Sequence, residues 1–339
     1  MDKELLRRLC ETDGVSGRED AVRALILQTL DASAAPHEKR VDAMGNIIVH
    51  LFGKRPAKQK LLLDAHVDEV GVLVTRIEED GFLRFSTVGG IDKQVLYGHR
   101  VRFGEHTGVI GGKAVHQCSD EERKDIPEPD AMAIDLGAES AKETSLWVSV
   151  GDFGTFDEEL TINGDIFCGK AVDDRIGCAL LLTLCMTQPP FDIWVSFSVQ
   201  EEIGARGAGV VAETVVPDIA IALDATTAAD TVGSTDATAV CRLGEGAVVS
   251  FADRGTLYDP DLYRNIRAWA AEQGIPTQTK TKVAGGNNSS ALQTRNTGAR
   301  VAAVSLPCRY IHSPVCTGSL RDVQAMEDLL RVLIARLPA

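Results

Sequence analysis

The hydrophobic pattern at the start of the chain predicts two helices followed by two strands. The first thirty residues have the apolar spacing of helices, interrupted by glycines. Ser16 and Glu19 have the spacing of a capping box, which predicts that a second helix begins here. Two strand-like runs follow at residues 46–52 and 60–65, and the second is almost entirely apolar. Such a run is typical of a strand that is covered on both faces.

The pattern changes at about residue 70 to short β-branched runs separated by glycine and charged residues. Strands are predicted at residues 71–77, 82–88, 100–103 and 108–110. No long amphipathic helix is visible between these runs. We therefore expect a small inserted β-barrel-like domain at residues 70–153, with the rest of the chain forming a larger domain around it.

Strands and helices alternate in the remainder of the chain. The predicted strands are residues 161–168, 193–199, 218–223 and 300–306. The predicted helices are residues 174–186, 206–214, 260–273, 290–295 and 319–337. This alternation predicts an α/β fold, with a mostly parallel or mixed sheet flanked by helices on both faces. We assign residues 1–69 and 154–339 to this domain.

Composition narrows the possible partners and location. The 339 residues include 35 basic and 49 acidic side chains, a net charge of −14 without any Lys/Arg run. Such a chain is a poor candidate for binding nucleic acid or an anionic membrane. Its start lacks the apolar core of a signal peptide, and no apolar stretch is long enough to cross a bilayer. The eight cysteines form no Cys-x-x-Cys pair, so we expect reduced thiols and a cytoplasmic protein.

Acidic and histidine side chains follow five of the predicted strands. In chain order they are His66 with Asp68, Asp173 with Asp174, Glu201 with Glu202, Asp224, and His312. Each one alone has an ordinary structural explanation as a turn residue, a helix cap or part of a solvated loop. Together they form a set of nitrogen and oxygen metal ligands without thiolate. They follow the ends of strands, which is where α/β sheets bind small molecules and ions. This set is typical of a dinuclear Zn, Co or Mn site.

The motifs around these residues resemble those of one known family. In order, they are Asp64-Ala65-His66-Val67-Asp68, Gly169-Lys170-Ala171-Val172-Asp173-Asp174-Arg175, Gln200-Glu201-Glu202-Ile203-Gly204, Leu223-Asp224 and Arg309-Tyr310-Ile311-His312-Ser313-Pro314. The chain is similar over nearly its whole length to the tetrahedral (TET) aminopeptidase and glutamyl aminopeptidase family of dinuclear metallopeptidases, metallopeptidase family forty-two. The resemblance implies the dinuclear zinc exopeptidase fold with an inserted β domain.

The resemblance also implies two divalent metal ions per subunit, which are Zn, Co or Mn. It implies that His66 and Asp224 hold the first ion and that Glu202 and His312 hold the second. Asp173 occupies the family's bridging position between the two ions, and we prefer it to Asp174 for that reason.

The implied activity is hydrolysis of N-terminal residues from short peptides by a water that bridges the metals. Asp68 would orient His66, and Glu201 would be the general base and acid. The family assembles dimers into tetrahedral dodecamers, so we expect a homo-oligomer. The inserted domain at residues 70–153 would provide oligomer contacts and control substrate access.

One position departs from the family pattern, and two other functions stay open. Asn288 stands where the family usually has Asp after paired glycines. A deacylase or amidase could use the same two metals on N-acyl substrates. A non-catalytic metal-binding homologue is the other alternative, and Asn288 is its only motivation. The preferred N-terminal residue is open, although an acidic preference would need a cation such as Arg254 or Arg309 near the pocket.

Overall fold

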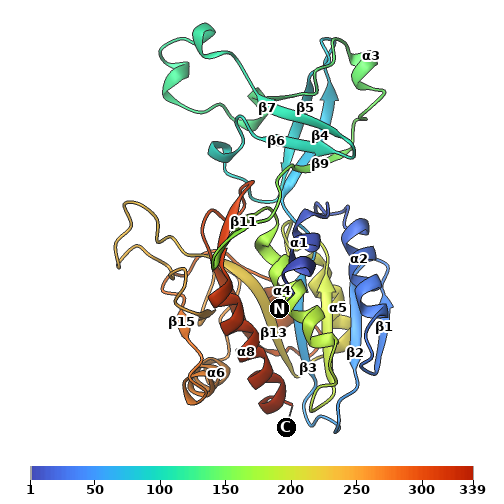
Figure 1. The fold of residues 1–339 in the computed structure, drawn as a ribbon, viewed down its shortest axis with the longest axis vertical. Coiled ribbons are helices and arrows are strands. Elements are labelled where there is room, and N and C mark those ends of the chain that lie inside the picture. The colour runs from blue at the N-terminus through green and yellow to red at the C-terminus, as the bar shows by residue number, and fades with distance from the viewer. Residues whose placement is uncertain (1, 339) are drawn as a thin grey trace.

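An eight-stranded mixed sheet runs through the larger part of the molecule, and a closed six-stranded barrel stands beyond one end of it (Figure 1). This computed structural model describes residues 2–338. The sheet strands, in spatial order, are β1 (His37–Val41), β2 (Ile47–Leu51), β12 (Ile193–Ser198), β3 (Leu61–His66), β13 (Ile219–Thr227), β16 (Arg300–Cys308), β14 (Ala247–Val249) and β15 (Thr277–Thr279). The four central strands, from β12 to β16, are parallel to one another, whereas the flanking β2 and β14 run antiparallel to them.

Helices cover both faces of the sheet because the central strands are apolar on both faces. In β3, Leu61 and Leu63 belong to one core while Leu62 belongs to a second core on the opposite face. The first core is covered by α1 (Lys3–Glu11), α2 (Asp20–Asp31), α4 (Val172–Cys185), α6 (Pro260–Glu272) and α8 (Leu320–Arg336). The second is covered by α5 (Arg206–Val215) and α7 (Ser289–Gln293). The predicted α/β fold class is therefore confirmed.

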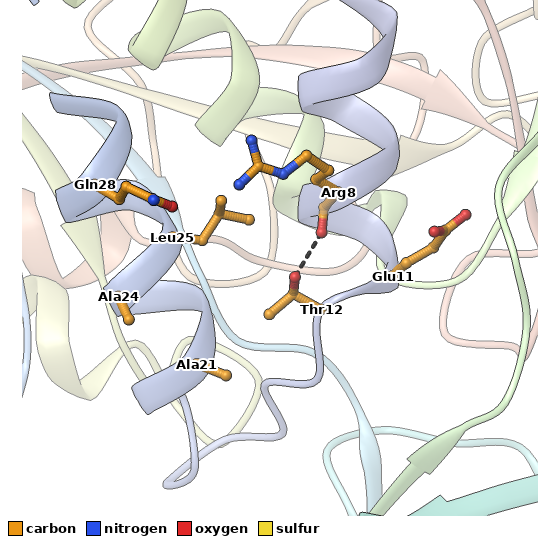
Figure 2. A pocket seen from close by; sticks show the side chains of 7 residues that line it. All are labelled: Arg8, Glu11, Thr12, Ala21, Ala24, Leu25 and Gln28. Carbon is orange, nitrogen blue, oxygen red and sulfur yellow. Dashed lines mark hydrogen bonds between the residues drawn. The ribbon is translucent and has the colours of Figure 1, made fainter. Parts of the chain in front are cut away.

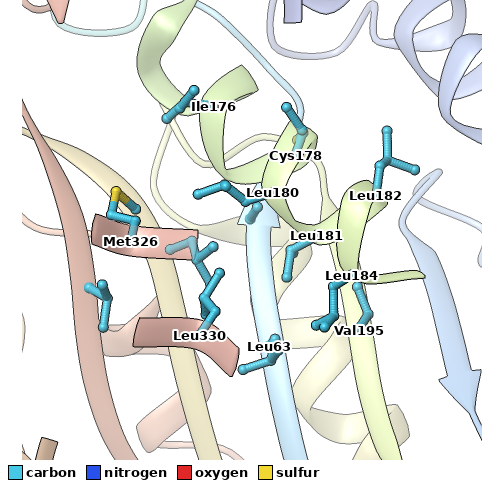
Figure 3. Close-up of a cluster of buried hydrophobic side chains, with 14 of the residues drawn as sticks. Leu63, Ile176, Cys178, Leu180, Leu181, Leu182, Leu184, Val195, Met326 and Leu330 are labelled. Carbon is cyan, nitrogen blue, oxygen red and sulfur yellow. The ribbon is translucent and has the colours of Figure 1, made fainter. Parts of the chain in front are cut away.

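The first core is densest between α4, α8 and the central strands. Figure 3 shows leucines of α4 and Met326 and Leu330 of α8 packed over Leu63 and Val195 of the sheet. Leu63 and Val195 are completely buried. Burial of these side chains supplies most of the driving force that fixes α4 on the sheet. The position of α4 matters because the helix begins beside the candidate site.

The barrel has its own hydrophobic core, separate from the two cores of the sheet. Its strands, in spatial order, are β4 (Gly71–Ile77), β5 (Leu83–Val88), β8 (Ala133–Asp135), β7 (His106–Gly111), β6 (Arg100–Phe103) and β9 (Phe153–Phe156). The short helix α3 (Ala141–Thr144) precedes β9. The β-barrel-like insertion expected from the sequence is thus present, and β8 and β9, which no prediction included, close it.

Two local predictions were wrong. The expected strand at residues 161–168 is a hairpin of β10 (Thr161–Asn163) and β11 (Ile166–Gly169), which pairs with β17 (Cys316–Ser319) in a separate three-stranded sheet. The capping box before α2 is also absent, because the Ser16 hydroxyl donates to Asp68 instead. Within residues 2–338, no helix is long and apolar enough to span a membrane.

Candidate metal centre

The five predicted ligands reach one place from different elements of the larger domain. His66 is the last residue of β3, Asp224 lies in β13, and Glu202 and His312 follow β12 and β16. These parallel strands end at the same edge of the sheet, so the residues at their ends converge. Asp173 arrives from the first turn of α4, after β11 of the small sheet. The sequence had placed the strand before Asp173 in the main sheet, and that placement was wrong.

The five side chains form two groups that share Asp173. In one group, His66 Nε2 lies 3.1 Å from Asp173 Oδ1 and 3.8 Å from Asp224 Oδ1. In the other, His312 Nε2 lies 3.3 Å from both Asp173 Oδ2 and Glu202 Oε2. Within each group, the possible ligand atoms all lie within 4.8 Å of one another. The two oxygens of Asp173 therefore face two different histidines, which is the arrangement that a carboxylate shared by two cations requires.

The adjacent aspartates 173 and 174 have different roles in the structure. Asp173 and Asp174 both have non-helical backbone angles, and the peptide bond between them is cis. Asp174 Oδ1 accepts a hydrogen bond from the Gly177 backbone N–H at 3.0 Å. Asp174 thus satisfies a free N–H in the first turn of α4, as capping carboxylates do. For this pair, the sequence left open both helix capping and a role in the site. Asp174 fits helix capping, and Asp173 fits a role in the site.

Asp68 connects the segments that carry three of the predicted site residues. Its backbone carbonyl lies 3.1 Å from His66 Nδ1, and its carboxylate lies 3.4 Å from the same nitrogen. The carboxylate also accepts hydrogen bonds from the backbone N–H groups of Glu201 and Glu202, at 2.9 and 3.1 Å. The Ser16 hydroxyl donates to it at 2.6 Å. A single fully buried carboxylate therefore fixes the end of β3 against the loop that follows β12.

The inserted module also contacts the candidate site. The His312 Nδ1 atom lies 3.0 Å from the Gly90 carbonyl oxygen, which leaves Nε2 facing Asp173 and Glu202. Gly90 lies just beyond β5 of the barrel. A carbonyl that binds one ring nitrogen sets the tautomer of a histidine ligand. Sequence reasoning missed Gly90, because a contact made through the backbone leaves no signal in residue type.

Interactions with neighbouring charged groups determine the direction of the pKa shifts of the two histidines and of Asp173. Burial alone would lower the pKa of His66, but hydrogen bonds with Asp173 and Asp68 raise that pKa well above its usual value. Burial likewise opposes the charge on His312, but Asp173 and the Glu202 charge raise its pKa to about 9. In the opposite direction, His312 and His66 outweigh burial and hold the pKa of Asp173 below its usual range. The Asp173 carboxylate is therefore stabilised by positive charge on both sides.

The other three carboxylates lack enough positive charge in the protein alone. Burial, with the neighbouring Asp173 charge, raises the pKa values of Glu202 and Asp224 well above their usual range. Burial also raises the pKa of Glu201 to about 7. Carboxylates this close cannot all ionise unless a cation lies between them. Because the donors are imidazole nitrogens and carboxylate oxygens without thiolate, they suit divalent Zn, Co or Mn.

Asn288 is not part of either ligand group. Its side-chain amide donates to Asp64 Oδ2 and to the Ser198 hydroxyl, both at 2.8 Å. Asp64 is fully buried and also accepts from the Ser196 hydroxyl at 2.5 Å. Asn288 therefore neutralises no charge but donates to a buried carboxylate of β3, the strand that also carries His66.

A cavity of about 280 Å³ lies beside the two groups. Its lining includes Asp173, Glu201, Asp224 and His312, together with Lys280. Neither arginine considered from the sequence lines it. The Arg309 guanidinium instead forms a two-pronged ion pair with Asp230, at 2.7 and 2.8 Å, and Arg254 is exposed. The cavity is lined instead by Lys280, which directly follows the three-residue strand β15.

A larger groove between α1 and α2 does not involve the site residues. It measures about 690 Å³ and is lined by seven residues, among them Arg8, Thr12 and Gln28. Figure 2 shows the Thr12 hydroxyl bonded to the Arg8 carbonyl, with Ala21, Ala24 and Leu25 on the facing helix. Among the described residues, these side chains form neither a group of metal ligands nor an ion pair with one another. The smaller cavity is therefore distinguished by the carboxylate and histidine side chains that line it, and not by its volume.

The sequence and the fold both match known aminopeptidases. Residues 45–329 match the family described as M42 glutamyl aminopeptidase. The lysyl aminopeptidase of Pyrococcus furiosus is 31% identical over 350 residues, covering 99% of this chain and 98% of that protein. A TET aminopeptidase from a marine sediment Thaumarchaeota archaeon has a TM-score of 0.93 at 32% identity, covering 98% and 96% of the two chains.

A second similar solved structure is of a protein that forms large assemblies. The TET1 peptidase of Pyrococcus horikoshii, which can assemble into a tetrahedron or a large octahedral shell, has a TM-score of 0.86 at 33% identity, with 98% of each chain covered. The family resemblance stated from the sequence motifs is confirmed. The chain belongs to the M42 glutamyl aminopeptidase family, and it is an aminopeptidase, a hydrolase.

Proposed function

We propose that this protein removes N-terminal residues from short peptides at a site that holds two divalent metal ions per subunit. The shared position of Asp173 carries the proposal, since its two oxygens face two separate ligand groups. His66 and Asp224 would complete the first site, and Glu202 and His312 the second. Membership of the family supports divalent metal binding, and Zn, Co or Mn would suit these donors.

The chain's own residues divide the chemistry between them. When bound, two divalent cations would polarise the scissile carbonyl and lower the pKa of the attacking water between them. Glu201 accepts a proton from that water and transfers it to the leaving amine. Asp68 holds the Glu201 backbone in place and orients His66.

The assembly of the Pyrococcus horikoshii TET1 peptidase supports an oligomeric state for this protein. We propose a homo-oligomer of dimers, extending to a tetrahedral dodecamer, with the inserted module at residues 70–153 making contacts and limiting substrate access. The module exposes large apolar side chains that an interface would cover, including Val115, Leu146 and Val150. Light scattering coupled to gel filtration would test the size. The eight free cysteines fit a reducing cytoplasm.

Aminoacyl anilides with free and N-acetylated amines test the activity. With Zn, Co or Mn added to the metal-free protein, we expect turnover of the free-amine substrates only. Cleavage of the acetylated substrates alone would show a deacylase instead. Glu201→Gln should lose about 10²- to 10⁴-fold in turnover while retaining both metals in elemental analysis. Unchanged hydrolysis by this variant would refute the assigned base.

A further inference from the structure

A loop without regular secondary structure forms part of the wall of the cavity beside the candidate metal centre. All four of its residues, 284–287, line that cavity. We call this segment the glycine loop, because it contains Gly285 and Gly286. A Cβ atom on Gly286 would meet no atom within 4 Å apart from its chain neighbours. Packing therefore does little to hold the glycine loop, and its position depends on hydrogen bonds.

Tyr258 connects the glycine loop to the turn that precedes α6. Its hydroxyl donates to Asp253 Oδ2 and accepts from the Asn287 side-chain amide, 3.1 Å away. Burial and the Asp253 charge raise the pKa of Tyr258, so the hydroxyl stays protonated and able to donate. Tyr258 is 5% exposed and belongs to the second core together with Leu292 of α7. Because its ring is fixed in that core, the hydroxyl is a fixed anchor for Asn287.

Asn288 connects the end of the glycine loop to the central sheet. Its side-chain amide donates at 2.8 Å to both Asp64 of β3 and Ser198 of β12. Asn288 is 3% exposed, so water does not compete for these bonds. Strand β3 ends at His66, two residues after Asp64. The glycine loop and a candidate metal ligand are therefore fastened to the same strand.

Two further hydrogen bonds hold the start of the glycine loop. The Arg254 backbone N–H donates to the Gly285 carbonyl oxygen at 2.9 Å, and Lys280 Nζ donates to the Ala284 carbonyl oxygen at 2.6 Å. These bonds do not involve Tyr258. Loss of its hydroxyl should therefore shift the end of the loop without releasing all of it.

We propose that Tyr258 and Asn288 are positioning residues for substrate binding, because together they hold the glycine loop where it forms the cavity wall. The proposal rests on the proposed function, since it takes this cavity as the place where substrate binds. Neither side chain lines the cavity, so both act through the loop. Their loss should raise KM with little change in kcat, because the groups assigned to the chemistry stay in place.

Tyr258→Phe removes the hydroxyl and keeps the ring. With aminoacyl anilides and the metal-loaded full-length protein, we expect KM to rise about 3- to 10-fold, the size of one lost hydrogen bond. The kcat value should stay within about twofold of the wild type. Tyr97→Phe is the matched control, because the Tyr97 hydroxyl donates to the Lys113 carbonyl oxygen in the inserted module and Tyr97 does not line the cavity. This control should leave KM unchanged.

Asn288→Ala tests the second anchor. Asp64 keeps hydrogen bonds from the Ser196 and Ser198 hydroxyls, so we expect this variant to fold. Its KM should also rise with little change in kcat. A fall in kcat alone, in proportion to a smaller folded fraction, would show that Asn288 only stabilises the fold and would contradict the proposal.

A double-mutant cycle tests whether Tyr258 acts through the glycine loop. Asn287→Ala removes the loop side chain that donates to the Tyr258 hydroxyl. In this background, Tyr258→Phe should add less than about twofold to KM, because the bond is already lost. Fully additive effects, or an unchanged KM in Tyr258→Phe itself, would refute the assignment.

Hydrogen exchange in the metal-free protein separates this proposal from the proposed function. The Ser289 backbone N–H donates to the Asn287 side-chain oxygen at 2.9 Å. Tyr258→Phe should speed exchange at this amide, and Tyr97→Phe should not. If exchange responds in this way but the wild type hydrolyses no aminoacyl anilide, the anchoring of the loop stands and the proposed function fails. Unchanged exchange in Tyr258→Phe would refute the anchoring.

Discussion

Replacing Asp68 by Asn should weaken both the fold and metal binding, although the two side chains have nearly the same shape. The Asp68 carboxylate accepts from Ser16 Oγ, Glu201 N and Glu202 N, and it is fully buried. An amide has one acceptor oxygen. The Ser16 hydroxyl can reverse its direction, but a backbone N–H cannot, so one of the two glutamate N–H groups then faces an NH₂ group.

The structure gives the size of this effect. A buried N–H that loses its acceptor costs about 1–3 kcal/mol, and the remaining bonds lose the roughly twofold strengthening that charge gives. We therefore expect Asp68→Asn to lower the free energy of unfolding of the metal-free protein by about 2–4 kcal/mol. Because Asp68 also orients His66 and the Glu202 backbone, metal affinity should fall about 10- to 100-fold.

Urea unfolding and metal titration calorimetry measure the two effects separately. Asp165→Asn is the control, since this half-exposed carboxylate pairs with Arg321 at the surface, and its change should stay within about 0.5 kcal/mol. Hydrogen bonds hold the pKa of Asp68 below its usual value, despite burial. Its stabilisation is therefore present above the unfolded pKa of about 4 and is lost as the pH falls through the folded value. A variant as stable as the wild type at pH 7, with unchanged metal affinity, would refute this reasoning.

Further predictions concern the same site and its supports. In the metal-free protein, raised pKa values keep protons on His312, Glu202 and Asp224. Metal binding should therefore release protons, and metal affinity should increase as the pH rises from 5 to 8. Calorimetry in buffers of different ionisation enthalpy measures the proton release, and a metal affinity that does not depend on pH would contradict this prediction. Lys170→Met removes the buried partner of Glu69, at 2.9 Å, and should cost about 3 kcal/mol in urea unfolding; a loss below 1 kcal/mol would show that the remaining donors to Glu69 suffice. Leu63→Ala, at a fully buried position, should cost about 2–5 kcal/mol, whereas Leu257→Ala, at a side chain that is 77% exposed, should stay within about 0.5 kcal/mol; equal losses would contradict the assigned core.

The sequence predicted the central strands, and it placed the candidate ligands on them, for one physical reason. Strands such as Leu61–His66 are buried on both faces, so their apolar runs are long and end abruptly at polar residues. His66 and Asp224 stand out at such ends. Only the family resemblance favoured Asp173 over Asp174 as the candidate ligand, because a capping carboxylate and a metal ligand look alike in sequence.

Features that depend on tertiary contacts could not be predicted in this way. The Gly90 carbonyl reaches His312 across 222 positions of the chain and involves no particular side chain. Ser16 had the spacing of a helix cap, but the buried Asp68 carboxylate is the partner that it contacts. Lys280 follows a strand of three residues, which is too short to leave a periodic pattern. Its burial became visible only when β15 was placed at the edge of the sheet.

Anomalous diffraction from crystals of the zinc-loaded protein, recorded at the zinc absorption edge, would test the proposed dinuclear site most directly. We predict two peaks per subunit, one beside His66 and Asp224 and the other beside Glu202 and His312, with one Asp173 oxygen directed to each. A single peak, or two peaks that do not share Asp173, would contradict the dinuclear site and the peptidase mechanism built on it.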